Sequence, residues 1–193
     1  MYFNHSMIRA AEEKYGTPKT LRLNYPTPKK HYDFIRSTQK NGRAHDVTLY
    51  LYHDNKLAVT QKPVYPEGSY RPPSGGLNPG ETLEEGALRE GFEELGINIT
   101  LDNYLLRVRV DFVYGAKRIA WTTHLFQVKY KGAGPPRLDP RDRHEISAAA
   151  WADEHDFFYR MRPGLLSVDS TGLLYRVHLH DYVWRQFGWG DVK

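Results

Sequence analysis

Three glutamates that lie close together in the sequence could hold a cation. Glu90, Glu93 and Glu94 are separated by three residues and then by one. On a helix that turns about 100° per residue, the three side chains project within an arc of about 100°. Carboxylate oxygens prefer hard cations, so we expect Mg²⁺ first and Mn²⁺ second, rather than zinc or copper. Such a cation would turn the repulsion among the three charges into attraction.

The loop before these glutamates is rich in glycine. Gly75 and Gly76 let the main chain approach a ligand closely, and the backbone carbonyl groups there could also bind a metal ion. Gly86 lies four residues before Glu90, so we expect its missing side chain to leave room for a phosphate group. The sequence therefore predicts that the loop and the acidic segment form one site.

A helix must position the glutamates. Thr82 and Glu85 have the spacing of a capping box, which predicts that the helix begins there. Gly96 predicts its end after Leu95, because glycine readily adopts the left-handed conformation that stops a helix. We expect a neighbouring apolar flank to pack against the core and hold the acids in place: Ala87, Leu88, Gly91, Phe92 and Leu95.

The rest of the pattern is that of an α+β domain. Two β-rich runs joined by Asp54-Asn55 predict a hairpin, and two longer strands, a short strand and a terminal helix follow. In chain order these segments are Val47–Tyr52, Leu57–Thr60, Tyr104–Phe112, Arg118–Tyr130, Ile146–Trp151 and Leu173–Phe187.

The first 45 residues lack the strand pattern of the remainder. Ala10–Lys14 predicts a short helix, and the prolines of the following segment predict an extended arm, Pro18–Pro28. We therefore expect an N-terminal extension over residues 1–45 and a catalytic domain over residues 46–193. The arm could serve assembly, so the sequence leaves a homodimer open.

Composition limits the function classes. The chain has 193 residues and no cysteine, which excludes disulfides, zinc–thiolate sites and cysteine nucleophiles. No apolar run approaches the roughly 20 residues of a bilayer-spanning helix, and the N-terminus lacks the apolar core of a secretion signal. We therefore expect a cytoplasmic protein without a membrane partner. The net charge of +4 suits a nucleotide substrate, but the scattered basic residues give little support for nucleic acid.

Residues Gly75–Ile97 resemble the Nudix box. Its pattern is Gly, five residues, Glu, seven residues, Arg-Glu, an apolar residue, any residue, Glu-Glu, any residue, Gly and an apolar residue. Every charged and glycine position of the pattern is present, and Gly91 is the one departure, at an apolar position. The resemblance implies an α/β/α sandwich with a mixed sheet. It also implies hydrolysis of a nucleoside diphosphate linked to another group, by a Nudix hydrolase acting on a phosphorus-containing anhydride.

The resemblance also implies roles for individual residues. Glu90, Glu93 and Glu94 match the metal-binding acids, and the first of them could also orient or deprotonate water. Arg89 matches the arginine that positions these carboxylates, and Glu81 matches the acid that anchors the loop to the helix. Many family members take the general base from a loop outside the box, and Glu145 is the candidate here.

Substrate contacts are less specified by the sequence. Tyr114 lies near the place where members that cleave diadenosine polyphosphates carry a tyrosine. Tyr70 and Arg71 could stack on a base or reach a phosphate, as could Tyr65 and Trp121.

Three alternatives stay open beside the hydrolase of small nucleotide derivatives. The first is a regulatory module that binds a nucleotide without turnover, and the second is a pyrophosphohydrolase that acts on the 5′ end of RNA. The third is a structural or interaction protein that uses the arm Pro18–Pro28.

Overall fold

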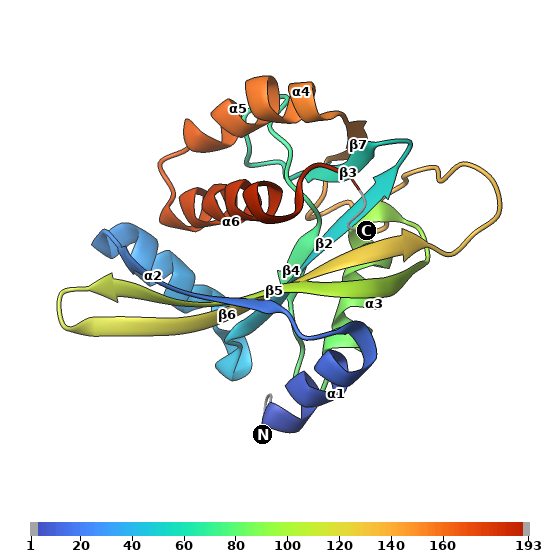
Figure 1. The fold of residues 1–193 in the computed structure, drawn as a ribbon. Helices are drawn as coiled ribbons and strands as arrows, with labels where there is room; N and C mark the ends of the chain where they lie inside the picture. Colours follow the sequence, from blue (N-terminus) through green and yellow to red (C-terminus); the bar gives the residue numbers. More distant parts are fainter. Residues whose placement is uncertain (1–3, 191–193) are drawn as a thin grey trace.

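The computed structural model describes residues 4–190. In it, a seven-stranded mixed sheet carries helices on both faces (Figure 1). The strands are β1 (Lys19–Pro26), β2 (His45–His53), β3 (Lys56–Gln61), β4 (Ser74–Gly76), β5 (Ile99–Tyr114), β6 (Lys117–Tyr130) and β7 (Ala148–Ala152). Their order across the sheet is β1-β5-β6-β2-β3-β7, and the short β4 pairs with β2. The pairs β1/β5 and β2/β6 are parallel, and the others are antiparallel.

The helices lie in two layers, one on each face of the sheet. They are α1 (His5–Tyr15), α2 (Lys29–Thr38), α3 (Leu83–Leu95), α4 (Glu154–Asp156), α5 (Arg162–Leu166) and α6 (Thr171–Phe187), with a 3₁₀ turn at Lys40–Gly42 and a π-helical turn at Phe157–Met161. α1 and α3 cover one face, and α2 and α6 cover the other (Figure 1). The expected α/β/α sandwich with a mixed sheet is therefore confirmed.

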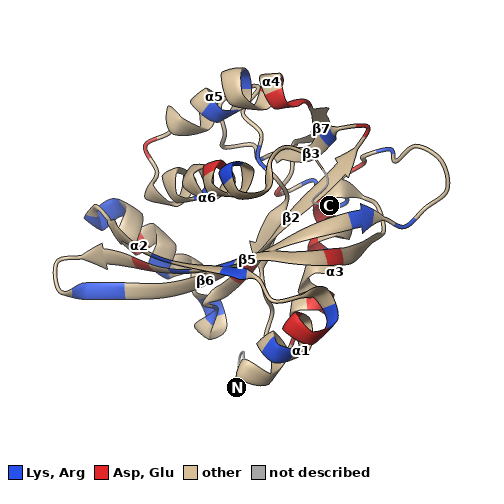
Figure 2. Cartoon of the chain, in the orientation of Figure 1, with Lys and Arg blue, Asp and Glu red and all other residues tan. Residues whose placement is uncertain are grey.

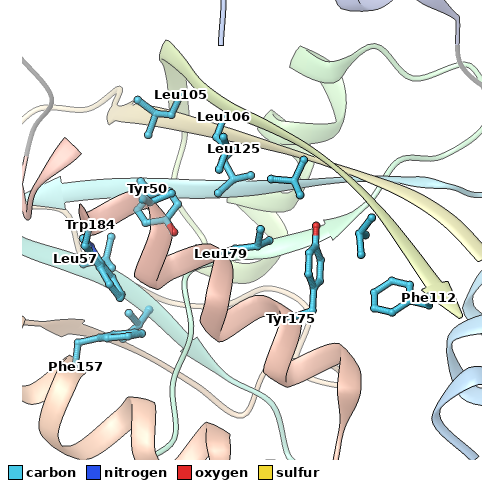
Figure 3. Packing of buried hydrophobic residues seen from close by; sticks show 14 of the residues in the cluster. Tyr50, Leu57, Leu105, Leu106, Phe112, Leu125, Phe157, Tyr175, Leu179 and Trp184 are labelled. Atoms are coloured by element: carbon cyan, nitrogen blue, oxygen red, sulfur yellow. The ribbon is translucent and has the colours of Figure 1, made fainter. Parts of the chain in front are cut away.

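The alternation of side chains along the central strands builds a core on each face. Val47, Leu49 and Leu51 of β2 are buried on the side of α1 and α3. Tyr50, between two of them in sequence, points to the other face and packs with α6 (Figure 3). This period of two is what a strand with both faces covered requires.

The elements predicted for residues 46–193 are present. β2 and β3 form the expected hairpin, with Tyr52 opposite Leu57 and with positive φ angles at Asp54 (+50°) and Asn55 (+59°). Asn and Asp tolerate this left-handed backbone better than most residues, which explains the turn. β5 and β6 extend beyond the predicted limits of the two long strands and pair along their length.

The N-terminal residues form two helices and a strand rather than a free extended arm. α1 is longer than predicted, and β1 runs parallel to β5 over all eight of its residues. Pro26 ends β1 at the edge of the sheet, where a residue without an N–H group is tolerated. α2, which the sequence analysis did not predict, buries Tyr32 and Ile35 in the core. The boundary at residue 45 stays a prediction.

Charges are distributed over the whole molecule. Figure 2 shows Lys and Arg on many elements, while Asp and Glu mark parts of α1 and α3. Among the helices of residues 4–190, none has the length and apolar character needed to cross a membrane.

Candidate active site

The helix that carries the three glutamates begins and ends as predicted. The Thr82 hydroxyl accepts from the Glu85 backbone N–H at 3.1 Å, and the Glu85 carboxylate accepts from the Thr82 N–H at 2.9 Å. Gly96 closes α3 in the left-handed conformation, at φ +72°. The caps fix where α3 begins and ends, and so they fix the positions of Glu90, Glu93 and Glu94 on the helix.

The packed flank of α3 is narrower than predicted. Ala87, Gly91 and Leu95 are buried, and Gly91 lies so close to Ile99 that a Cβ atom would be 2.6 Å from its Cδ1 atom. The departure from the Nudix pattern at residue 91 therefore matches a local packing requirement. Leu88 and Phe92 are 37% and 45% exposed, so the prediction that they pack against the core was wrong.

Gly86 also plays a different part from the expected one. A Cβ atom at Gly86 would overlap the side chain of Leu77, a fully buried residue of the glycine-rich loop that packs against α3. The space beside this glycine is thus filled by the loop's own side chain rather than left for a phosphate group. Gly86 allows the glycine-rich loop to lie close against the helix.

Glu90 lies buried beside Arg89 and carries a raised pKa. Its side chain is nearly buried, and one oxygen accepts from Arg89 Nη1 at 2.6 Å. Burial, and then the negative charge of Glu94, raise the pKa of Glu90 to about 7. Gly75 packs directly on the carboxyl group of Glu90, because a Cβ atom at that position would overlap it. The loop and the acid are therefore matched in shape.

Arg89 holds the acidic cluster together. Its Nε and Nη2 atoms donate to the two oxygens of Glu81 at 2.7 and 3.0 Å, and Nη2 also donates to the Gly76 carbonyl at 2.9 Å. Its Nη1 atom donates to Glu93 at 2.9 Å as well as to Glu90. Hydrogen bonding to Glu81 raises the pKa of Arg89 further above its usual value. One guanidinium group therefore joins the loop to the acids of α3.

Glu81 anchors the loop from the other side. Its carboxylate accepts from the Asn78 N–H at 2.7 Å and from the Asn78 side chain at 3.1 Å. Burial opposes ionisation, but the hydrogen bonds from Arg89 and Asn78 hold the pKa of Glu81 at about 2. Both oxygens are used inside the protein, which is the arrangement of a positioning residue.

Glu94 is held by the strands rather than by Arg89. Its carboxylate accepts from the Ser74 N–H at 3.0 Å, from the Thr60 hydroxyl at 3.2 Å and from Arg71 Nη2 at 3.3 Å. Arg71 is only 2% exposed, and although burial opposes its charge, Glu94 keeps the pKa of Arg71 raised. β3 and β4 thereby fix the third acid.

Arg71 has no N–H group left for a substrate in this structure. Its donors reach the Tyr65 hydroxyl, the Pro72 carbonyl, and the hydroxyl and carbonyl of Ser74, besides Glu94. These five bonds account for the five N–H groups of a guanidinium. The predicted contact between Arg71 and substrate is therefore replaced, in this conformation, by contacts that order Glu94.

One cavity of about 560 Å³ collects most of the predicted site residues. It is lined by Gly75, Arg89, Glu90, Glu93 and Glu94, and also by Arg71 and Glu145. This volume lies within the range of small-molecule sites in proteins.

Three predicted residues lie outside the wall of this cavity. Glu81 stands behind Arg89, and Tyr70 packs partly buried against the core on the side of α6. Tyr114 ends β5, where its ring lies 5.9 Å from that of Tyr32. Neither tyrosine contributes to the cavity wall in the described part of the chain.

Glu145 lies at the cavity with a largely exposed side chain. Its carboxylate accepts from Lys62 Nζ at 2.6 Å, and the two residues line the wall together. The neighbouring Ile146 is fully buried and fixes this segment to the fold. Glu145 is thus placed where a loop-borne base could act, and its role stays a prediction.

The sequence analysis missed Arg176, which α6 brings to the cavity. Its Nη1 atom donates to the Ser74 hydroxyl at 2.6 Å, and its Nη2 atom donates to Asp46 at 3.2 Å. Ser74 also accepts from Arg71, so one hydroxyl joins two guanidinium groups beside Glu94. Nothing in the local pattern of α6 marks Arg176, because its partners lie about 100 and 130 residues earlier.

The donor set of the cavity fits a divalent cation. Glu90, Glu93 and Glu94 offer carboxylate oxygens, and Gly75 lines the same wall. The raised pKa of Glu90 shows that its negative charge lacks full compensation. No three Asp, Glu or His side chains within residues 4–190 stand ready-made as a metal site, and Arg89 engages both Glu90 and Glu93.

Solved structures of similar overall shape share little sequence with the chain. A NUDIX hydrolase from Nitrosomonas europaea is 18% identical, with a TM-score of 0.48, over 72% of this chain and 88% of that one. An ADP-ribose pyrophosphatase from Streptococcus suis 89-1591 is 12% identical, with a TM-score of 0.44, over 76% and 96%. These similarities carry no functional argument.

A curated relative and a family description match parts of the sequence more directly. The NAD-capped RNA hydrolase NudC of Vibrio atlanticus (strain LGP32) is 31% identical over 107 residues, which is 55% of this chain. The chain covers only 36% of that relative's length. The description of the NUDIX domain family matches residues 42–168, which include the glycine-rich loop, α3 and Glu145. The chain therefore belongs to the NUDIX domain family.

Proposed function

We propose that this protein hydrolyses a diphosphate linkage in a nucleoside diphosphate derivative and uses a divalent cation, Mg²⁺ first and Mn²⁺ second. The observation that carries the proposal is the meeting of Glu90, Glu93 and Glu94 in the wall of one cavity. Membership of the NUDIX domain family supports it. A surface helix gains nothing from burying two like charges, whereas a site that binds a cation requires them.

The cation would be held by Glu90, Glu93 and Glu94 together with the carbonyl group of Gly75. When bound, it supplies positive charge that offsets the diphosphate and makes water more acidic. The chain's own groups orient these partners: Arg89 aligns Glu90 and Glu93, while Ser74 and Thr60 align Glu94.

In the proposed reaction the oxygen of water attacks one phosphorus, and the anhydride P–O bond on its far side breaks. The proton of the water passes to a carboxylate, and the leaving phosphate departs with the bonding electrons. Glu145 is the proposed acceptor of the proton, because it lies in the cavity wall with an exposed carboxylate. Glu90, which lies in the same cavity wall, is the other candidate for orienting or deprotonating the water.

A panel of substrates tests this function directly. Dinucleoside polyphosphates, nucleotide sugars, ADP-ribose and nucleoside triphosphates would be supplied with Mg²⁺, and release of phosphate or nucleoside monophosphate would be measured. Glu94→Gln should lower the rate on the best substrate at least about a hundredfold. Glu84→Gln, on the same helix but paired with Lys14 at the surface, is the matched control and should keep the rate. Equal rates for wild type and Glu94→Gln would contradict the proposal.

A second candidate substrate is the 5′ end of RNA. The name of the NudC relative from Vibrio atlanticus describes a hydrolase of NAD-capped RNA, and NAD itself contains a diphosphate linkage between two nucleosides. Comparing NAD-capped RNA with free NAD at equal concentration distinguishes the two substrates. A preference for the RNA that weakens as salt rises would favour this candidate. A protein that binds nucleotides but turns over none of the panel would favour the regulatory module instead.

A further inference from the structure

The cavity that holds the three acids continues into an apolar part. α2 contributes Phe34, Ile35 and Thr38 to its wall, and the start of α6 contributes Leu173. Phe112 and Trp121, from β5 and β6, complete this region together with Val64 of the loop after β3. Acidic and aromatic walls therefore belong to one continuous space.

Two side chains of the apolar part are unusually exposed. Phe34 is 67% exposed and Val64 is 81% exposed, although both are large hydrophobic residues. Of the exposed large hydrophobic residues in the described part of the chain, only Tyr159 is comparably open. A hydrophobic side chain left open at the mouth of a cavity is typical of a surface that a ligand covers.

The position of Phe34 is fixed by the helix that carries it. On the inner side of α2, Tyr32 and Ile35 are buried in the core. His31 on the same helix lies with its Nδ1 atom 3.1 Å from the Thr171 hydroxyl at the start of α6. Phe34 is therefore an aromatic ring on a firmly packed helix, which suits a stacking surface.

A cationic group lies in the same wall. Arg176 follows Tyr175 on α6 and reaches Ser74, whose N–H donates to Glu94. Arg176 is paired with Asp46, and the second carboxylate oxygen of Asp46 is buried without a hydrogen-bond partner in the described structure. Guanidinium groups recognise phosphate oxygens, so this region suits the charged backbone of a nucleotide.

From this arrangement we infer that α2 forms the wall of the subsite for the nucleobase of the substrate, with Phe34 as a stacking residue. The inference rests on the proposed function and adds which part of the chain recognises the organic group. A planar ring fits better than an aliphatic tail, because three aromatic residues, Phe34, Trp121 and Tyr65, line the cavity. Thr38 and Ser170, which lie in the same wall, can satisfy the polar edge of a base.

α2 lies outside the part of the chain that matches the NUDIX family. Residues 29–38 precede residues 42–168, the part of the chain that the NUDIX family description matches. The metal-binding acids thus come from the common domain, while the stacking residue comes from a segment outside it. Phe34 of the N-terminal segment then adds to the base selectivity that Trp121 and Tyr65 of the matched part supply.

Binding of product-like probes tests the inference without turnover. The probes are AMP, GMP, UMP and CMP, with ribose 5-phosphate as the probe that lacks a base. Phe34→Ala should weaken binding of the preferred nucleotide about tenfold and change ribose 5-phosphate binding less than about twofold. Phe34→Trp should restore the affinity, and Tyr159→Ala, at an exposed aromatic residue outside the cavity wall, should leave it unchanged.

A spectroscopic signal separates stacking from a structural effect. The fluorescence of 2-aminopurine riboside 5′-monophosphate should be quenched by wild type and by Phe34→Trp, but much less by Phe34→Ala at saturation. Equal losses for nucleotide and ribose 5-phosphate, or no effect of Phe34→Ala, would overturn the inference. So would the failure of every nucleotide to bind more tightly than ribose 5-phosphate. Nucleotide binding that depends on Phe34 in a protein without hydrolytic activity would uphold the subsite and reject only the proposed reaction.

Discussion

The carboxyl group of Glu90 fills the space that Gly75 leaves by having no side chain. The contact joins the glycine-rich loop to an acid of the cavity whose pKa is raised to about 7. Loop and helix therefore have to change together, and several measurable consequences depend on this fit.

Gly75→Ala should displace Glu90, because the new methyl group would overlap its carboxyl group. We expect kcat/KM to fall at least about tenfold, since small displacements at a catalytic site are costly. Steady-state hydrolysis of the best substrate measures the effect. Glu84→Gln, at a surface pair with Lys14 outside the cavity wall, is the control and should keep the wild-type kinetics. Unchanged kinetics for Gly75→Ala would show that the fit is not needed for activity.

Arg89→Lys should disrupt the acidic cluster although it keeps the positive charge. An ammonium group cannot reproduce the paired contacts with Glu81 or reach the Gly76 carbonyl at the same time. We expect kcat to fall about a hundredfold and the free energy of unfolding to fall by about 1–3 kcal/mol. Kinetics and urea unfolding measure the two effects. Arg160→Lys, at an exposed pair with Asp156, should change neither quantity.

Without metal, Glu90→Gln should make the protein more stable. At pH 8 the ionised carboxylate is disfavoured by burial and by Glu94, which raise its pKa to about 7. Removing the charge should raise the free energy of unfolding by up to about 3 kcal/mol. Thermal unfolding in the presence of a chelator tests this expectation, with Glu84→Gln as the control. A loss of stability in Glu90→Gln would mean that Arg89 already compensates the charge.

Adding Mg²⁺ should stabilise wild type more than variants that lack one of the acids. A cation at about a hundred times its dissociation constant stabilises the folded state by about 2.7 kcal/mol. Wild type should therefore gain Tm on titration with MgCl₂, while Glu93→Gln and Glu94→Gln should gain much less. Differential scanning calorimetry at constant ionic strength, adjusted with NaCl, measures the difference. Equal gains in all three proteins would place the cation elsewhere.

Acid should destabilise the fold through buried histidines. Burial lowers the pKa of His124 and His180 well below 6.5, so both rings are neutral in the folded protein. The unfolded chain binds protons below about pH 6.5 that the folded chain does not, so stability is lost as pH falls below that value. At pH 5 the loss should be about 2 kcal/mol for each ring.

Comparing variants isolates this effect from that of Glu90, which acts in the opposite direction. His180→Phe should show a smaller loss of unfolding free energy between pH 7 and pH 5 than wild type. His144→Asn, at an exposed position, should keep the wild-type dependence. Urea unfolding at each pH supplies the free energies. Parallel curves for wild type and His180→Phe would exclude His180 as a source of acid sensitivity.

Local signals in the sequence predicted the acidic helix well. The capping box, the closing Gly96 and the spacing of Glu90, Glu93 and Glu94 all act within a few residues. The Asp54–Asn55 turn and its flanking strands are equally local. Such features are encoded by propensity and spacing, which a single sequence displays.

Features that depend on distant contacts could not be predicted in the same way. Arg176 is recognised as part of the site only through its hydrogen bonds to Ser74 and Asp46. β1 forms a strand by pairing with β5, which is distant in the sequence. Leu88 and Phe92 follow the apolar pattern of a core flank, yet the sheet covers only the arc occupied by Ala87, Gly91 and Leu95. Apolar spacing shows which residues could be buried, and tertiary packing decides which of them are.

The parallel pairing of β1 with β5 protects one edge of the sheet. β1 is the outermost strand next to β5, and its eight residues cover the edge from Leu106 to Val113. Removing this strand would leave a long row of unpaired amide and carbonyl groups, which invites another molecule to add a strand. Shortening the protein from its amino end therefore carries a risk of aggregation, even where Glu90, Glu93 and Glu94 stay intact.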